Sequence, residues 1–205
     1  MTRHYDAILF DFDGVLADTE PIHWACWAET LAPLGIELTW DTYRSNCVGV
    51  ADRNMLAFLA SLARQPLDPE TLRPQYAGKK DLFRRRILEA KPCASATVEM
   101  IQSLTEYRLA VVTSSGRQEV EPVLEYAGIH ACLDAAVYGE DVKRHKPDPE
   151  PYLLAASRLG CQRPLVVEDS AAGVASGTAA GFDVIQVPSA AQTPELVLKK
   201  ILRSS

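Results

Sequence analysis

The chain has few of the features that mark secreted, membrane-bound or zinc-binding proteins. Its five cysteines are an odd number without a C-x-x-C pair, which predicts reduced thiols and neither a disulfide framework nor a zinc site. No apolar stretch is long enough for a signal peptide or a membrane span. We therefore expect a soluble, cytoplasmic protein with no membrane partner.

Positive charge is also scarce. The 205 residues carry a formal net charge of −6, and no basic run dominates any region, which argues against a nucleic-acid partner. The short cluster 84–86, three arginines, is the exception, and a solvated helix face explains it better than a polyanion site. The 47% hydrophobic content suffices for a buried core. We expect a monomer.

Short apolar runs alternate with helical patterns over much of the chain. The runs with the strongest strand character cover residues 7–10, 109–112, 165–167 and 184–187, with 135–138 as a weaker fifth. The expected buried residues of two intervening helices are Val120, Val123 and Leu124 in 118–126, and Leu153, Leu154 and Ala156 in 151–159. Strands that alternate with helices predict an α/β fold with a parallel sheet.

The stretch between the first and second strands differs, because it has helical spacing and no convincing strand. Helices are expected over residues 22–34, 53–63 and 69–88. We interpret this block as an inserted helical lid, with residues 17–92 in the insertion and residues 1–16 and 93–205 in the α/β domain.

The first strand ends on two acids. Asp11-Phe12-Asp13-Gly14 follows directly after the apolar run 7–10. Two carboxylates this close repel unless a cation or a proton lies between them, so a divalent metal beside a carboxylate nucleophile is the favoured interpretation. The alternative is a metal-free turn in which Asp13 caps the next segment and Asp11 is incidental, because Asp-Gly is a common turn pair.

The second strand ends in small hydroxyl residues. Thr113, Ser114 and Ser115 precede a helix that is expected to begin near Arg117. Hydroxyls and backbone N–H groups at a helix N-terminus form an anion site. Ordinary N-capping by Ser114 or Ser115 is the alternative.

A lysine follows the weak strand 135–138. Lys146 lies directly before Pro147, and together with Pro149 this proline stiffens the backbone and excludes helix until Glu150. A fixed ammonium group is a good partner for a phosphoryl group or a buried carboxylate. A solvated loop lysine is the alternative.

The strand at 165–167 ends in Glu168 and Asp169, and Asp169 or Ser170 can cap the helix that follows. The carboxyl ends of parallel strands meet at one edge of a sheet, where ligands bind. Hard carboxylate oxygens, with no histidine or thiol nearby in the sequence, favour Mg²⁺. A carboxylate held on Mg²⁺ near a lysine suits attack on phosphorus through a covalent acyl phosphate. The second acid of the first motif, Asp13, can protonate the leaving oxygen and later deprotonate water.

These four motifs, in this order from the first strand to about residue 187, resemble those of the haloacid dehalogenase superfamily of phosphatases and phosphomutases. The resemblance implies a Rossmann-like parallel sheet of order 3-2-1-4-5 with a helical cap inserted after the first motif. It also implies a Mg²⁺-dependent phosphatase that acts on a small phosphorylated metabolite, with sugar phosphates among the candidates.

The resemblance implies a role for each motif residue. Asp11 would be the nucleophile and Asp13 the general acid/base. Thr113, with the backbone that follows it, would hold the phosphoryl group, and Lys146 would stabilise both that group and Asp11.

It also implies a metal site and further contacts. Asp169 would bind Mg²⁺ together with the Asp11 side chain and the Asp13 backbone carbonyl, while Glu168 would act mainly through water. The other candidates for phosphate or substrate contact are Gly14, Ser114, Ser115, His23, Gly49 and Arg53. Weaker candidates from the cap are Val50, Lys79, Lys80 and the cluster 84–86.

Two details indicate which reaction and which branch of the superfamily the chain resembles. Dehalogenases and phosphonate-cleaving members lack an acid at the position of Asp13, so this residue favours phosphate esters. Residues 18–23 and Trp27 look like the β-phosphoglucomutase-like branch, in which His23 would face the active site from the cap hinge; a satisfied helix histidine is the alternative. The mutases carry an arginine three residues after a cap glycine, whereas here that place holds Asp52 and Arg53 comes one later.

Two rival functions use similar residues. A phosphomutase has the same core but returns the phosphoryl group to the sugar. A receiver-type signalling domain also combines acids, Mg²⁺, a hydroxyl and a lysine on a parallel sheet. It places its phosphorylated aspartate after the third strand, however, and the inserted helical block has no role in it.

Overall fold

The computed structural model describes residues 4–48, 50 and 52–203. The chain folds as two compact units: Met1–Asp18 with Lys91–Ser205, which we call the α/β unit, and Thr19–Ala90, which we call the helical unit. Within the described ranges, no helix has the length and apolar character that a membrane span requires.

The α/β unit contains a five-stranded sheet in the order β3-β2-β1-β4-β5, with each neighbouring pair parallel. The strands are β1 (Ala7–Phe10), β2 (Arg108–Val112), β3 (Ala135–Val137), β4 (Pro164–Glu168) and β5 (Asp183–Gln186). This order confirms the predicted Rossmann-like fold. Because β1 lies between β2 and β4, with Phe10 opposite both Val111 and Val167, the residues that follow these three strands emerge side by side.

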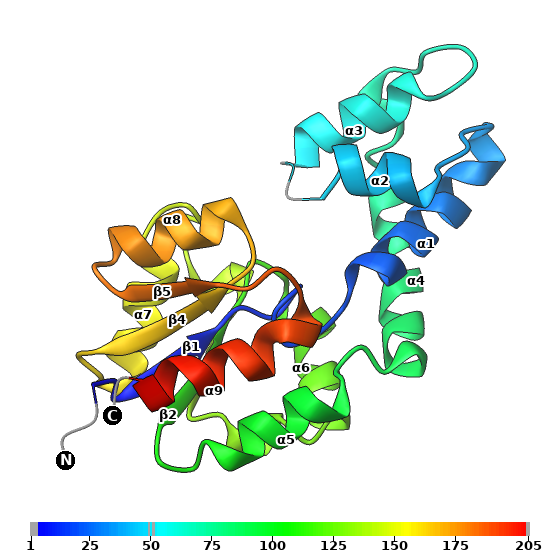
Figure 1. Cartoon of the computed structure of the whole chain (residues 1–205). Helices are drawn as coiled ribbons and strands as arrows, with labels where there is room; N and C mark the ends of the chain where they lie inside the picture. Colours follow the sequence, from blue (N-terminus) through cyan, green and yellow to red (C-terminus); the bar gives the residue numbers. More distant parts are fainter. Residues whose placement is uncertain (1–3, 49, 51, 204–205) are drawn as a thin grey trace. The chain divides into compact units, whose positions relative to one another are not determined.

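Helices cover both faces of this sheet. They are α5 (Ser95–Ser103), α6 (Arg117–Tyr126), α7 (Glu150–Leu159), α8 (Ala171–Ala179) and α9 (Thr193–Arg203). Helices α5 and α9 lie on one face, and α7 and α8 lie on the other (Figure 1). Strands that are buried on both faces are apolar at every position, which explains why β1 is the continuous run AILF and is buried throughout.

The predicted buried face is confirmed for α6 and only in part for α7, where Ala156 is buried but Leu153 is not. Val120, Val123 and Leu124 of α6 are buried. On α7 the buried positions include Tyr152 and Ala155, whereas Leu153 is 47% exposed. The buried positions Tyr152, Ala155 and Leu159 follow the helical period, and Leu153 lies outside the face that they form. The ring of Tyr152 packs with alternate residues of the central strands.

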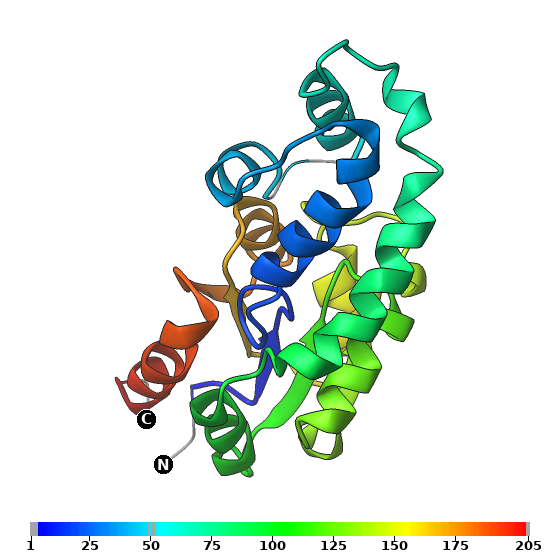
Figure 2. The same ribbon diagram turned by 90° about the vertical axis from the view of Figure 1, so that its right-hand side faces the viewer.

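The helical unit contains α1 (Glu20–Leu31), α2 (Trp40–Asn46), α3 (Asp52–Ser61) and α4 (Gln75–Ala90). Helices α1 and α4 lie side by side (Figures 1 and 2). A separate apolar core, which includes Trp27, Leu31, Leu59 and Leu72, fills this unit. The short 3₁₀ turns of the whole chain are η1 (Ala32–Leu34), η2 (Pro69–Thr71), η3 (His130–Cys132), η4 (Gly139–Asp141) and η5 (Ala190–Gln192).

Two features of the helical unit differ from the prediction. Helix α2 was not expected, although Thr39 caps it by accepting a hydrogen bond from the N–H of Thr42. The helix expected over residues 69–88 is divided into η2 and α4. Pro74 directly precedes α4 and cannot donate the N–H that a continuous helix would need.

Candidate active site

The acidic loop after β1 closes tightly on itself. The carbonyl of Phe12 accepts hydrogen bonds from the N–H groups of Leu16 and Ala17, and the N–H of Gly14 donates to the carbonyl of Ala17 at 2.9 Å. Gly14 has a φ of +72°, and a Cβ at this position would lie 2.1 Å from Oδ2 of Asp169. Only glycine therefore lets this loop approach Asp169, which follows β4.

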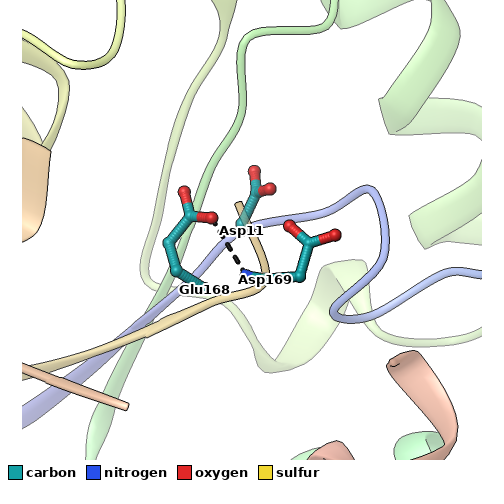
Figure 3. Close-up of side chains that lie close together, drawn as sticks. All are labelled: Asp11, Glu168 and Asp169. Carbon is teal, nitrogen blue, oxygen red and sulfur yellow. Dashed lines mark hydrogen bonds between the residues drawn. The ribbon is translucent and has the colours of Figure 1, made fainter. Parts of the chain in front are cut away.

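Three carboxylates from two strands converge at this edge of the sheet. Asp11, Glu168 and Asp169 each offer one oxygen, and these oxygens all lie within 4.8 Å of one another (Figure 3). Asp11 follows central β1, whereas Glu168 ends neighbouring β4 and Asp169 comes next. The parallel pairing of β1 with β4 brings these acids together.

Lys146 contacts two of these three acids, Asp11 and Glu168. Its Nζ donates to Oδ1 of Asp11 at 3.0 Å, to the carbonyl of Val112 at 2.8 Å and to Oε1 of Glu168 at 2.6 Å. Its side chain is only 6% exposed, so it is not a solvated loop lysine. Asp11 is likewise not an incidental turn residue, because one of its oxygens is held by this ammonium group. Among the described residues, no donor reaches the other oxygen of Asp11.

Glu168 directs both of its oxygens to protein donors. Oε1 accepts from Lys146 and from the hydroxyl of Tyr152 at 2.8 Å. Oε2 accepts from the N–H groups of Asp169 and Ser170 and from the hydroxyl of Ser170, at 3.1 to 3.2 Å. Sequence reasoning missed Tyr152, and its only signal was a hydroxyl-bearing aromatic residue six positions after Lys146.

Burial and mutual repulsion set the charges of these groups. Burial raises the pKa of Asp11 well above its ordinary value; the ammonium of Lys146 opposes this rise, and the charges of Glu168 and Asp13 add to it. Burial, with the nearby charge of Glu168, also raises the pKa of Asp169 to about 6. Burial disfavours the charged form of Lys146. The carboxylates of Asp11 and Glu168 outweigh this effect and raise the pKa of Lys146 above its usual value.

These observations fit a divalent cation of the Mg²⁺ class. The donors are carboxylate oxygens, which hard cations prefer. One buried lysine faces two buried acids, with the partly buried Asp169 beside them, so the group has an excess of negative charge. A cation would stabilise the charged forms of Asp11 and Asp169, which burial and the neighbouring carboxylates disfavour.

The hydroxyl residues after β2 meet the loop after β1. The hydroxyl of Ser115 donates to Oδ2 of Asp13 at 2.7 Å, and the N–H of Ser115 donates to the hydroxyl oxygen of Thr113 at 3.0 Å. Within the described part of the chain, the hydroxyl proton of Thr113 and the N–H groups of Phe12 and Ser114 have no acceptor. This leaves three donors near the acids for an anionic ligand.

The N-terminus of α6 is contacted by a carboxylate and not by either of the serines that the sequence offered as caps. Its N-cap is Gly116, which has no side chain to offer, and neither Ser114 nor Ser115 caps the helix. Instead, the carboxylate of Glu140 accepts from the N–H of Arg117 at 3.0 and 3.3 Å. A carboxylate from η4 therefore already occupies this helix end.

His23 belongs to the helical unit and contacts other members of that unit. Its ring stacks on Phe83 with the ring centres 3.9 Å apart, and its Nδ1 lies 2.5 Å from Nζ of Lys79. Burial, and the charges of Lys79 and Lys80, lower the pKa of His23 well below its ordinary value. His23 is therefore held neutral inside this unit.

The remaining cap candidates also lie in the helical unit. Arg53 is exposed on α3, and Val50 is 37% exposed. Gly49 lies outside the described residues. Arg84 and Arg86 form ion pairs, at 3.0 and 2.5 Å, with exposed acids of α4 and α1. These pairs fit the solvated helix face that the sequence predicted for this cluster.

Comparisons with known proteins agree with the fold and the motifs. A family model described as haloacid dehalogenase-like hydrolase matches residues 8–187. The chain is 31% identical to a phosphorylated carbohydrates phosphatase of Thermotoga maritima over 182 residues, which are 88% of this chain and 83% of that protein. It is 31% identical to the fructose-1-phosphate phosphatase of Escherichia coli over 192 residues, 91% of this chain and 98% of that protein.

A solved structure extends the likeness to the fold. The crystal structure of β-phosphoglucomutase from Clostridium difficile superposes with a TM-score of 0.75 at 19% identity, covering 97% of this chain and 98% of that one. The chain therefore belongs to the haloacid dehalogenase-like hydrolase family, as its four motifs predicted, and the receiver alternative is set aside.

Proposed function

We propose that this hydrolase is a Mg²⁺-dependent phosphatase that cleaves a small phosphorylated sugar through a phosphoaspartyl intermediate on Asp11. The observation that carries the proposal is the environment of Asp11, whose Oδ1 is held by Lys146 at 3.0 Å beside the carboxylates of Glu168 and Asp169. The relatives named for phosphorylated carbohydrates and fructose 1-phosphate support a sugar phosphate as the substrate.

In the first step, an oxygen of Asp11 attacks phosphorus and the bond from phosphorus to the sugar oxygen breaks. Asp13 gives a proton to the leaving oxygen, and Ser115, which donates to Oδ2 of Asp13, orients that carboxyl group. The ammonium of Lys146, the hydroxyl of Thr113 and the backbone N–H of Ser114 stabilise the phosphoryl oxygens.

In the second step, Asp13 takes a proton from water, whose oxygen attacks the phosphorus of the acyl phosphate. The bond between phosphorus and the Asp11 oxygen breaks, which releases inorganic phosphate and restores the Asp11 carboxylate. The two steps together hydrolyse one phosphate ester and leave the chain unchanged.

The metal would be held by the side chains of Asp11 and Asp169 and by the backbone carbonyl of Asp13. Mg²⁺, when bound, supplies positive charge that offsets the acids and the transferring phosphoryl group. Glu168 would act through water, because both of its oxygens already accept hydrogen bonds from the protein.

The helical unit would act as the cap that excludes water and selects the sugar. We propose His23, Gly49 and Arg53 as its first candidates for substrate contact. Gly14 would contribute indirectly, by allowing the close approach of Asp169.

The test is a screen of phosphorylated sugars and related metabolites for Mg²⁺-dependent phosphate release, repeated with Asp11→Asn. We expect Asp11→Asn to abolish turnover, because an amide is not a nucleophile of this kind and forms no acyl phosphate. Asp41→Asn makes the same chemical change at an exposed aspartate of α2 and should retain full activity. Substantial Mg²⁺-dependent turnover by Asp11→Asn would reject the proposal.

The phosphomutase alternative has its own assay. β-Glucose 1-phosphate, supplied with its bisphosphate activator, should release inorganic phosphate or remain unchanged if the protein is a phosphatase. Isomerised product without free phosphate would instead assign the mutase reaction.

A further inference from the structure

We call Asp11, Glu168 and Asp169 the acid cluster. Tyr152 of α7 contacts this cluster through Glu168, from the face of the sheet that α7 covers. We propose that Tyr152 is a positioning residue: its hydroxyl orients Glu168 so that Lys146 stays shared with Asp11 and the segment carrying Asp169 stays in place. The kinetic part of this inference rests on the proposed function, whereas the metal-binding part can be measured without any substrate.

The first support is the geometry at Oε1 of Glu168. This oxygen accepts from Nζ of Lys146 at 2.6 Å and from the Tyr152 hydroxyl at 2.8 Å. Glu168 and Tyr152 are both 0% exposed, so bulk water cannot take the place of the Tyr152 hydroxyl at this oxygen. Removing one donor would leave a buried charge less well satisfied.

The second support is the competition for Lys146. Its ammonium lies closer to Glu168, at 2.6 Å, than to Asp11, at 3.0 Å. The Tyr152 hydroxyl donates to the same Glu168 oxygen, so that oxygen forms a weaker hydrogen bond with the ammonium of Lys146 than it would alone. Without the hydroxyl, we expect Lys146 to move toward Glu168 and away from Asp11.

The third support is the connection from Glu168 to Asp169. Oε2 accepts from the N–H groups of Asp169 and Ser170, so the orientation of the Glu168 carboxylate fixes the backbone that carries Asp169. Space around this carboxylate is small, because a Cβ at Gly173 would lie 1.7 Å from Oε1. A rotation at Oε1 therefore moves Oε2 and the segment bonded to it.

The chain also contains a matched control for the hydroxyl. Tyr138 is 1% exposed, and its hydroxyl has no hydrogen-bond partner among the described residues. Tyr138→Phe and Tyr152→Phe thus remove the same atom from two buried rings, and only one of these atoms contacts the acid cluster.

The experiment compares these two variants in two measurements. The first is the rise in Tm of the substrate-free protein as Mg²⁺ is added, which reports binding of the metal alone. The second is the steady-state kinetics of the best substrate from the screen, from which kcat and KM are determined separately. For Tyr152→Phe we expect the half-saturating Mg²⁺ concentration to rise several-fold and kcat to fall about tenfold with little change in KM, the size of one lost hydrogen bond to a charged group. Tyr138→Phe should match the wild type in both.

A Tyr152→Phe protein that has a lower Tm but wild-type Mg²⁺ binding and wild-type kcat would assign the hydroxyl a purely structural role and overturn the inference. If Tyr152→Phe does not fold, Glu168→Gln provides a second test, because it should produce the same loss of Mg²⁺ binding. Normal Mg²⁺ binding by Glu168→Gln would equally overturn the inference. If the wild type binds Mg²⁺ but hydrolyses no phosphate ester, the proposed function fails while the Tm comparison still decides the role of Tyr152.

Discussion

The two units of this protein each bury a lysine side chain near an aromatic ring, but the polar groups beside the two lysines differ. In the α/β unit, Lys146 lies among carboxylates that follow two parallel strands. In the helical unit, Lys79 is 5% exposed, and its Nζ lies beside the ring nitrogen of His23 and 5.0 Å from the centre of the Phe83 ring. A parallel sheet gathers carboxylates where its strands end, whereas the helical unit places its lysine beside the ring nitrogen of a histidine.

This difference extends to the titrating groups. The pKa of Asp169 is raised to about 6, chiefly by burial, whereas burial and Lys79 lower the pKa of His23. The α/β unit therefore holds acids that a cation would stabilise, and the helical unit holds a base that resists protonation. The predictions below test whether these two kinds of buried charge behave as differently as their surroundings imply.

The largest expected effect comes from removing the cation of the α/β unit. Lys146→Met would leave Asp11 and Glu168 buried without their ammonium partner, and the free energy of unfolding should fall by about 3–5 kcal/mol. Urea unfolding followed by far-UV circular dichroism measures this loss. Lys143→Met, an exposed lysine of the same segment, should change stability little. Equal stability of the two variants would show that the ammonium is not needed to hold the acids.

A glycine in each unit offers the next comparison. Gly14 and Gly35 have nearly the same φ, +72° and +70°, but a Cβ at Gly14 would meet Asp169 at 2.1 Å, whereas nothing lies within 4 Å at Gly35. Gly35→Ala should lower stability by about 1–2 kcal/mol through backbone strain alone. Gly14→Ala adds the clash, so it should destabilise the protein more and also weaken Mg²⁺ binding.

Unfolding of the helical unit can be observed separately from that of the α/β unit. The chain has three tryptophans, and all of them lie in the helical unit: Trp24, Trp27 and Trp40. Tryptophan fluorescence should therefore detect the destabilisation by Gly35→Ala. A Gly35→Ala protein that loses as much Mg²⁺ affinity as Gly14→Ala would contradict the clash as the cause.

The pH dependence of the helical unit is the third prediction. The pKa of His23 is lower in the folded state than its unfolded value of about 6.5, so the unfolded chain binds more protons below that pH. The stability due to neutral His23 is fully present above about pH 6.5 and falls by at most about 1.4 kcal/mol per pH unit as the pH drops toward the folded pKa.

Urea unfolding followed by tryptophan fluorescence at several pH values measures this slope. His23→Gln should reduce it, and His145→Gln, an exposed histidine of the α/β unit, should not. The same slope in wild type and His23→Gln would mean that another group controls the pH response.

The smallest expected effect concerns the cap of α6. Glu140→Ala removes the carboxylate that accepts from the N–H of Arg117, and stability should fall by about 1 kcal/mol or less. Glu140→Gln keeps an acceptor oxygen and should lose less. If both variants are as stable as wild type, water satisfies this helix end equally well.

Much of the acid cluster could be predicted from the sequence, because strand ends carry it. Asp11, Thr113 and Glu168 each follow or end an apolar run, and parallel pairing brings such residues to one edge whatever the details of packing. Tyr152 and Glu140 could not be found in this way. Their contacts depend on which side of α7 meets the sheet and on how η4 lies against α6.

The sequence by itself determined the parallel sheet, its strand order through a family resemblance, and the acids, hydroxyls and lysine gathered at its edge, because strand and helix periods are local properties. Only the tertiary structure decided that both oxygens of Glu168 accept hydrogen bonds from the protein and that Asp169 leaves no room for a side chain at Gly14. It also decided that the Glu140 carboxylate accepts a hydrogen bond at the N-terminus of α6. Those outcomes depend on how closely side chains far apart in the chain approach one another in the folded protein, and residue order alone does not set such distances.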